Sequence, residues 1–223
     1  MSKRKILFLA MALSIVAILA VGATLAYFTD VDEVNNVMTM GNVDISLDEA
    51  LVVKTEDKWT ANAEADRVQA NTYEDIYPGA VLPKDPTVHN DGSYEAYVRA
   101  NVTVDFNKLA GLQEDGILFN GNSPDADLLS IIDIDTENWT YAGRSIVMEG
   151  DIRDVTYTYT YNKPLVADAD ATLFTKVTIP TFVTNETVAT YGLASFNVDV
   201  VAEAIQTFGF ADAEAAWAAY DAE

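Results

Sequence analysis

The side chains with the greatest capacity for chemistry in this sequence are carboxylates spaced two residues apart. They occur in three places: Asp125 and Asp127; Asp133, Asp135 and Glu137; Asp168 and Asp170. Alternate residues of an extended segment point to the same side, and calcium prefers such oxygen ligands. The second group imitates the start of an EF-hand loop, but Asn138 replaces its glycine and Arg144 its bidentate glutamate. We interpret these groups as solvated surface carboxylates and predict no cofactor, because 35 acidic residues produce such spacings by chance. Calcium is the alternative, with Asp133, Asp135 and Glu137 as its candidate ligands.

A zinc hydrolase is the enzymatic alternative. Zinc hydrolysis generally uses three protein ligands, often including two histidines, and an open coordination position. The sequence has one histidine, His89, and no His-Glu-x-x-His motif. It also has no cysteine, which removes thiolate catalysis and cysteine-ligated zinc. We interpret His89 as a turn or strand-end residue, and we predict no catalytic residue and no enzyme.

The net charge of −22 at pH 7 restricts the partners. A strongly acidic chain repels nucleic acid and anionic membranes, so a nucleic-acid function is excluded. Acid, salt or divalent cations should promote association, because they neutralise or screen the carboxylates. Without disulfides the fold must rely on its hydrophobic core, which a chain of this length can form.

The N-terminus has the layout of a secretory signal peptide. Lys3, Arg4 and Lys5 precede an apolar run over residues 6–21, and Thr24-Leu25-Ala26 supplies a small-x-small cleavage site. We predict a signal peptide over residues 1–26, cleavage between Ala26 and Tyr27, and a secreted domain over residues 27–223. The alternative is an uncut membrane span, since residues 6–28 carry no charge.

The secreted region is expected to be an antiparallel β-sandwich of jelly-roll type. Period-two alternation or β-rich composition predicts strands in five places: Asn42–Leu47, Tyr94–Phe106, Asp154–Tyr161, Leu173–Ile179 and Ser195–Val201. Tyr77-Pro78-Gly79 predicts a tight turn, and Asn90-Asp91-Gly92 is the strongest hairpin signal. On the third strand Tyr157, Tyr159 and Tyr161 share one face, which forms either a packing surface or an exposed patch for partners.

Two regions depart from this strand pattern. Residues 107–141 contain several glycines and are expected to be an insertion, with a short helix near Ala126–Ile132. Residues 202–220 are alanine-rich and are expected to form a C-terminal helical cap over one end of the sandwich. Asp212 suits the N-cap position of this helix, and its packing face should comprise Ala213, Ala216, Trp217 and Tyr220.

Motifs along the chain resemble those of one group of secreted bacterial proteins. The leader junction reads ATLAYFTD over residues 23–30 and leads into an Asn-rich stretch and the Gly41-Asn42-Val43-Asp44 segment. Further matching motifs are Tyr77-Pro78-Gly79, Asn90-Asp91-Gly92, Ala96-Tyr97-Val98-Arg99, Leu173-Phe174, Ile179-Pro180, Ala202–Phe210 and Ala213–Trp217. This combination resembles the TasA biofilm-fibre proteins and the camelysin-like (CalY) proteins, whose signals are cut by a SipW-type signal peptidase.

The resemblance implies a jelly-roll-like sandwich, export by the secretory route, and a place in the extracellular matrix or at the surface of a Gram-positive-type cell. It implies self-association or association with related matrix subunits, processing by a SipW-type signal peptidase, and no membrane contact after cleavage. It also implies that the mature N-terminal segment, residues 27–41, is donated as a β-strand to the next subunit, with Tyr27, Phe28 and Val31 filling an apolar groove. The alternative is that residues 27–40 form the first edge strand of their own sheet.

Two other functions stay open at this point. Camelysin-like relatives are described as zinc endopeptidases, so the first alternative is a secreted metalloendopeptidase. The second is a surface binding module that does not polymerise.

Overall fold

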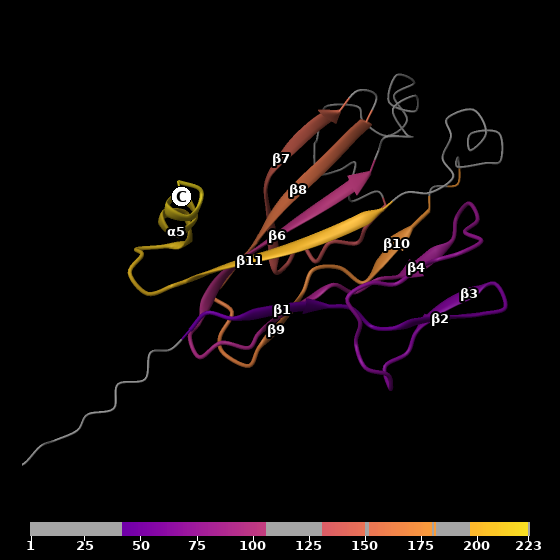
Figure 1. Ribbon diagram of the computed structural model, residues 1–223, viewed down its shortest axis with the longest axis horizontal. Coiled ribbons are helices and arrows are strands. Elements are labelled where there is room, and N and C mark those ends of the chain that lie inside the picture. The colour runs from indigo at the N-terminus through magenta and orange to yellow at the C-terminus, as the bar shows by residue number, and fades with distance from the viewer. Residues whose placement is uncertain (1–41, 106–130, 150–151, 180, 182–196, 223) are drawn as a thin grey trace, which may run out of the picture. The chain divides into compact units, whose positions relative to one another are not determined.

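Antiparallel strands are the main secondary structure of the computed structural model, which describes residues 42–105, 131–149, 152–179, 181 and 197–222 (Figure 1). These residues belong to one compact unit, residues 41–223. In them the largest sheet has four strands, in the order β11 (Val198–Gln206), β6 (Ala96–Asp105), β8 (Ile152–Tyr161) and β7 (Trp139–Glu149). A three-stranded sheet has the order β1 (Ile45–Asp48), β5 (Thr87–Asn90) and β9 (Asp170–Thr172). Two smaller sheets pair β4 (Val81–Pro83) with β10 (Lys176–Thr178) and β2 (Val52–Thr55) with β3 (Lys58–Ala61).

Strand β6 has a partner on both sides, and its sequence explains its central place. The alternation expected over residues 94–106 is confirmed, because one set of alternate side chains is at most 1% exposed: Ala96, Val98, Ala100, Val102 and Val104. Strand β8 pairs with one edge of β6 and β11 with the other. Because β6 is paired along both edges, its buried backbone N–H and C=O groups can form hydrogen bonds with the neighbouring strands.

One hydrophobic core joins the sheets. Side chains of the four-stranded sheet, such as Val98 and Tyr157, belong to the same buried cluster as Val88 of β5 and Val177 of β10. Trp139 is 1% exposed, and its indole N–H donates to the carbonyl of Thr172 in β9 at 3.0 Å. The expected all-β sandwich is therefore confirmed, while its jelly-roll connections stay a prediction.

The tyrosine face of β8 is a packing surface. Tyr157 and Tyr159 are at most 1% exposed, and the ring of Tyr159 meets that of Tyr141 edge-on at 5.8 Å. Tyr161 is partly buried and packs against the core, with its ring 5.0 Å from that of Trp139. The alternative of an exposed tyrosine patch is therefore wrong.

The two predicted turns behave differently. At Tyr77-Pro78-Gly79 the tight turn forms: the amide of Ala80 donates to the carbonyl of Tyr77 at 3.0 Å, and Gly79 has φ +81°. The hairpin expected at Asn90-Asp91-Gly92 does not form, because β5 pairs with β1 and β9 whereas β6 pairs with β8 and β11.

Asn90 turns this segment into a corner between the two sheets. Its side chain is 1% exposed. Its amide group donates to the carbonyls of Tyr94 at 2.9 Å and Leu165 at 2.8 Å, and its Oδ1 accepts from the amide of Gly92 at 3.1 Å. These bonds direct the chain into the other sheet.

The insertion expected over residues 107–141 is shorter than predicted at its C-terminal end. Ile131, Ile132 and Ile134 are core residues, and Ile132 forms a bridge to Val177. Trp139–Tyr141 already belong to strand β7. Residues 106–130, which include most of the helix expected near Ala126–Ile132, lie outside the described residues.

The C-terminal helix is also shorter than predicted. Residues 202–206 continue strand β11, because they stay paired with Ala96–Ala100 of β6. Helix α5 spans Ala213–Tyr220, and the predicted cap is present, since Asp212 accepts from the amide of Ala215 at 2.9 Å. No helix in the described ranges has the length and hydrophobicity to cross a membrane.

Helix α5 packs on the outward-facing side of β6. The guanidinium of Arg99 lies over the Trp217 ring at 4.5 Å and donates to both carboxylate oxygens of Asp221, at 2.8 and 3.0 Å. Because Arg99 points away from the core-facing Val98 and Ala100, the helix covers this outer face instead of the end of the sandwich.

Candidate functional site

A groove of about 690 Å³ opens between strand β1 and strand β11. In the described part of the chain each of these strands has one paired edge, β1 with β5 and β11 with β6. The other edge of each is free to pair. Apolar side chains contribute much of the lining: Leu47, Tyr73, Leu82, Val177, Val198 and Val200. An apolar groove between strand edges is the arrangement that accepts an added extended strand.

A buried polar cluster closes one wall of this groove. Glu49 is 2% exposed because its backbone pairs with Val68 and draws its side chain inward. Its Oε2 accepts from Lys84 Nζ at 2.6 Å, and its Oε1 accepts from the side-chain amide of Asn71 at 2.9 Å. Tyr73 donates its hydroxyl to the carbonyl of Pro83. Burial, together with the charges of Glu49 and Asp85, raises the pKa of Tyr73 well above its usual value.

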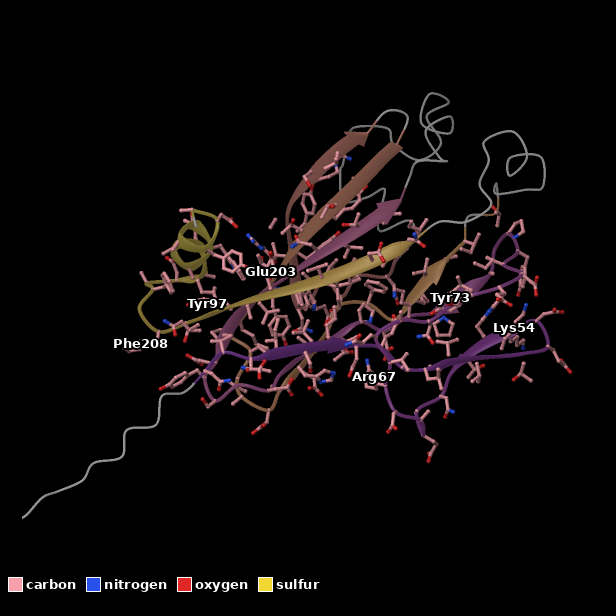
Figure 2. The ribbon with its side chains drawn as sticks, viewed as in Figure 1. Lys54, Arg67, Tyr73, Tyr97, Glu203 and Phe208 are labelled. Carbon is pink, nitrogen blue, oxygen red and sulfur yellow. The ribbon has the colours of Figure 1, made fainter. Side chains whose placement is uncertain are left out.

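A second polar network lies on the outer side of the three-stranded sheet, next to the groove. His89 Nδ1 lies 2.6 Å from Asp170 Oδ1, and His89 Nε2 lies 2.9 Å from Asp48 Oδ1. Arg67, labelled in Figure 2, joins Asp48 to Asp85, donating to the Asp85 carboxylate at 2.9 Å. This histidine thus links all three strands of the sheet.

The charges of this network shift the pKa values of its members. Burial opposes the charged imidazole, but the hydrogen bonds to Asp48 and Asp170 outweigh it and raise the pKa of His89. Burial likewise opposes the charged form of Asp48, yet bonds from Arg67 and His89 prevail and lower the pKa of that carboxyl. The network therefore favours a charged imidazole between two carboxylates.

Strand β1 begins beside a close backbone contact. The amide of Gly92 donates to the carbonyl of Asp44 at 3.0 Å, and the amide of Ser93 donates to the carbonyl of Asn42 at 3.1 Å. A Cβ atom on Gly92 would lie only 2.6 Å from the Asn42 carbonyl oxygen. This contact holds the residues at the start of β1 against Gly92 and Ser93.

Comparison with known proteins finds one matching family model. Residues 2–108 match the family model described as camelysin metallo-endopeptidase. This match over residues 2–108 supports the resemblance of the chain to the TasA and camelysin family. No curated protein and no solved structure matches the chain. The matched region contains the predicted leader, β1, the Gly92 contact and β6. At family level the match supports a secreted surface or matrix protein.

The family description implies a metal, which the described residues do not fit. The two ring nitrogens of His89 lie on opposite sides of the imidazole, and each already contacts a different carboxylate. The sequence has no second histidine to complete a zinc site of the usual kind. In the ranges that the structure describes, no group of three or more His, Asp or Glu side chains is placed to hold a metal.

The predicted calcium ligands serve separate loops. Asp133 accepts from the amides of Thr175 at 3.0 Å and Lys176 at 2.8 Å and from the Thr175 hydroxyl at 2.7 Å. Burial opposes its charged form, but these bonds prevail and lower the pKa of Asp133. Asp135 accepts from the amide of Glu137 and from the side chain of Asn138. Calcium binding by Asp133, Asp135 and Glu137 stays an untested alternative.

Other predicted residues are either apart or outside the described ranges. Asp170 contacts His89, whereas Asp168 has φ 58° and donates its amide to the carbonyl of Asn90. The residues expected to act in cleavage and assembly, Ala26, Tyr27, Phe28 and Val31, lie outside the described residues, as do Asp125 and Asp127.

Local sequence patterns do not reveal which residues form the groove or the histidine network. His89 contacts residues 41 and 81 positions away, and the groove joins residues 47–49 with residues 197–201. Such contacts depend on the strand order, which local periodicity does not reveal.

Proposed function

We propose that this protein is a structural subunit of the extracellular matrix or cell surface, and that it assembles by strand donation. In this proposal residues 27–41 of one copy occupy the groove between β1 and β11 of another copy. The match of residues 2–108 to the camelysin family model supports a secreted surface or matrix protein. The groove is the observation that carries the finer proposal.

The groove has the chemistry that an added strand requires. The unpaired edge of β11 offers N–H and C=O groups for main-chain hydrogen bonds, which supply affinity. Val198 and Val200 are partly buried, and Leu47 and Leu82 lie on the opposite wall. Apolar side chains of the donated segment, such as Phe28 and Val31, would be buried there and would set the register.

The length of the N-terminal segment suits donation to another copy. Asn42 is held beside Ser93, and from there β1 runs towards the groove, which Leu47 and Glu49 line. Residues 27–41 would span roughly 50 Å when extended, which is ample for a neighbouring groove.

Donation of this kind is a head-to-tail contact. Because donor and acceptor are different surfaces, such a contact need not close into a ring, and it then produces filaments. The strongly negative chain opposes assembly at neutral pH, and acid or salt should relieve that repulsion.

Electron microscopy of purified residues 27–223 tests the proposal, at neutral pH and near pH 4.5. Filaments should form, and a chain that lacks residues 27–35 should form none. Val201 is 57% exposed on β11 and lines the groove. Val201→Lys should block assembly, because an edge lysine opposes strand pairing.

A matched control lies on the other edge of the same sheet. Val147 of β7 is 59% exposed, so Val147→Lys makes the same change at similar exposure and should leave filaments intact. Filaments from the truncated chain would contradict the proposal. Dispersed particles in every condition would favour a surface binding module that does not polymerise.

We expect no peptidase activity, although the family is named for one. His89 is the single histidine of the sequence, and among the described residues no group of three or more His, Asp or Glu side chains is placed to hold a metal. Casein cleavage that a chelator abolishes would overturn this expectation and favour a camelysin-like metalloendopeptidase.

A further inference from the structure

The buried carboxylate of Glu49 holds an amine and an amide on its two oxygens. Its Oε2 accepts from Lys84 Nζ at 2.6 Å, and its Oε1 accepts from Asn71 Nδ2 at 2.9 Å. The side chain of Glu49 is 3% exposed and that of Lys84 is 16% exposed. A nucleophile, an acyl group and a proton carrier therefore meet in one partly closed pocket, which is the set of groups that amide exchange requires.

We propose that Lys84 and Asn71 join autocatalytically through a side-chain amide bond, with Glu49 as the proton carrier. Glu49 takes a proton from Lys84 Nζ, and the free amine attacks Cγ of Asn71. The bond between Nζ and Cγ forms, and the bond between Cγ and Nδ2 breaks. Protons returned by Glu49 let Nδ2 leave as ammonia. The step changes no oxidation state and needs no co-reactant.

The carbonyl of Asn71 is prepared for this attack. Its Oδ1 accepts from the backbone amide of Val52 at 2.7 Å. This donor polarises the C=O bond and would stabilise the negative charge that develops on the oxygen as the amine adds. The leaving nitrogen, Nδ2, already contacts the carboxylate that would protonate it.

The reactive groups are also fixed in position. The backbone amide of Asn71 donates to Glu49 Oε1 at 2.8 Å, and its Nδ2 donates to the carbonyl of Ala50 at 2.8 Å. Lys84 follows Pro83, at the end of β4, and donates its amide to the carbonyl of Thr175 at 3.1 Å. Reactants held in this way lose little entropy when they react.

The bond would serve a chain that has no cysteine. It would close a loop from residue 71 to residue 84, which includes the Tyr77-Pro78-Gly79 turn, and so fix one wall of the groove. The inference does not depend on strand donation, because it concerns chemistry within a single subunit. The alternative is that Lys84 and Glu49 form only a buried ion pair, with Asn71 bridging backbone groups.

Intact-mass spectrometry of the purified, denatured protein distinguishes these alternatives. The wild type should be lighter than the mass of its sequence by one ammonia. Lys84→Arg keeps a positive charge at this position but removes the amine nucleophile, and it should have its full mass. Glu49→Gln removes the proton carrier and should also have its full mass. Loss of ammonia from the Lys84→Arg protein would place the reaction elsewhere and overturn the proposal.

Tryptic mapping of the wild type locates the bond even if a variant fails to fold. Arg67, Lys84 and Arg99 bound two tryptic peptides, residues 68–84 and 85–99. A modified Lys84 resists trypsin, so one peptide covering residues 68–99 and lacking one ammonia is expected. Full mass with normal cleavage after Lys84 would overturn the proposal. Loss of water in place of ammonia would also overturn it, because that would put the bond on Glu49.

Discussion

His89 Nδ1 and Asp170 Oδ1 lie 2.6 Å apart and join strand β5 to strand β9 across the surface of the three-stranded sheet. The same imidazole contacts Asp48 of β1 through its other nitrogen. The side chain of His89 in β5 therefore contacts carboxylates from both neighbouring strands of this sheet.

The first prediction concerns pH. Because the pKa of His89 is raised in the folded protein, its contribution is fully present below about pH 6.5, the unfolded value. That contribution is lost as the pH rises through the higher folded value. We expect the free energy of unfolding to fall by about 1 kcal/mol over this window, the usual scale for partly exposed ion pairs.

Urea denaturation at several values between pH 5.5 and 8.5 measures this loss. In the His89→Gln protein the free energy of unfolding should no longer fall between pH 5.5 and 8.5. A uniform decrease at every pH, with the same slope, is not expected. An equally steep decline in the His89→Gln protein would contradict the role of this residue. Below about pH 4 the sign reverses, since the lowered pKa of Asp48 means that protonating it costs stability.

The second prediction concerns the backbone contact at the start of β1. A Cβ on Gly92 would lie 2.6 Å from the oxygen of Asn42 and 2.7 Å from the nitrogen of Asp44. Both are backbone atoms, so Gly92→Ala should displace the chain and destabilise the fold by about 1–3 kcal/mol.

Gly143 in β7 is the matched control, because a Cβ there meets nothing within 4 Å. Gly143→Ala should change the urea midpoint little. Equal midpoints for the two alanine variants would mean that the contact between Gly92 and the start of β1 is not tight.

The third prediction concerns how helix α5 is attached. Arg99 binds Asp221 with two nitrogens, contacts Glu203 at 2.7 Å and stacks on Trp217. Lysine keeps the charge but cannot form the same planar fork. Arg99→Lys should therefore expose Trp217, which would red-shift tryptophan fluorescence and speed proteolysis after residue 206. Unchanged fluorescence and cleavage would contradict this attachment.

Local patterns predicted the parts of the fold that depend on local chemistry. The alternation of Val98, Ala100 and Val102 marked β6, and Asp212 marked the start of α5. Strand β7 was missed, because its register shifts between Tyr141 and Gly143 and breaks the alternation. The residue types of Asn90-Asp91-Gly92 predicted a hairpin. The hydrogen bond from Asn90 to the carbonyl of Leu165, 75 positions away, could not be predicted from this local sequence.

The candidate site could be predicted only in part. The sequence indicated a donated N-terminal segment through its family resemblance, and it singled out carboxylates by their spacing. It did not reveal the acceptor groove. Leu47 and Val200 line the same groove because two different sheets pack together, and local patterns do not show which strands become neighbours. The sequence did not reveal the cluster of Glu49, Asn71 and Lys84 either, because the spacing of these three residues matches no known motif.

The absence of native cysteine makes one cross-linking measurement especially direct. Val31→Cys protein is mixed with Val201→Cys protein under assembly conditions and treated with a short bifunctional thiol reagent. Strand donation predicts mixed dimers that join residue 31 of one copy to residue 201 of another, identified by mass spectrometry. Val147→Cys protein should give few such dimers. Assembled filaments that yield no 31–201 cross-link, or equal cross-linking at residue 147, would contradict strand donation into the β11 groove.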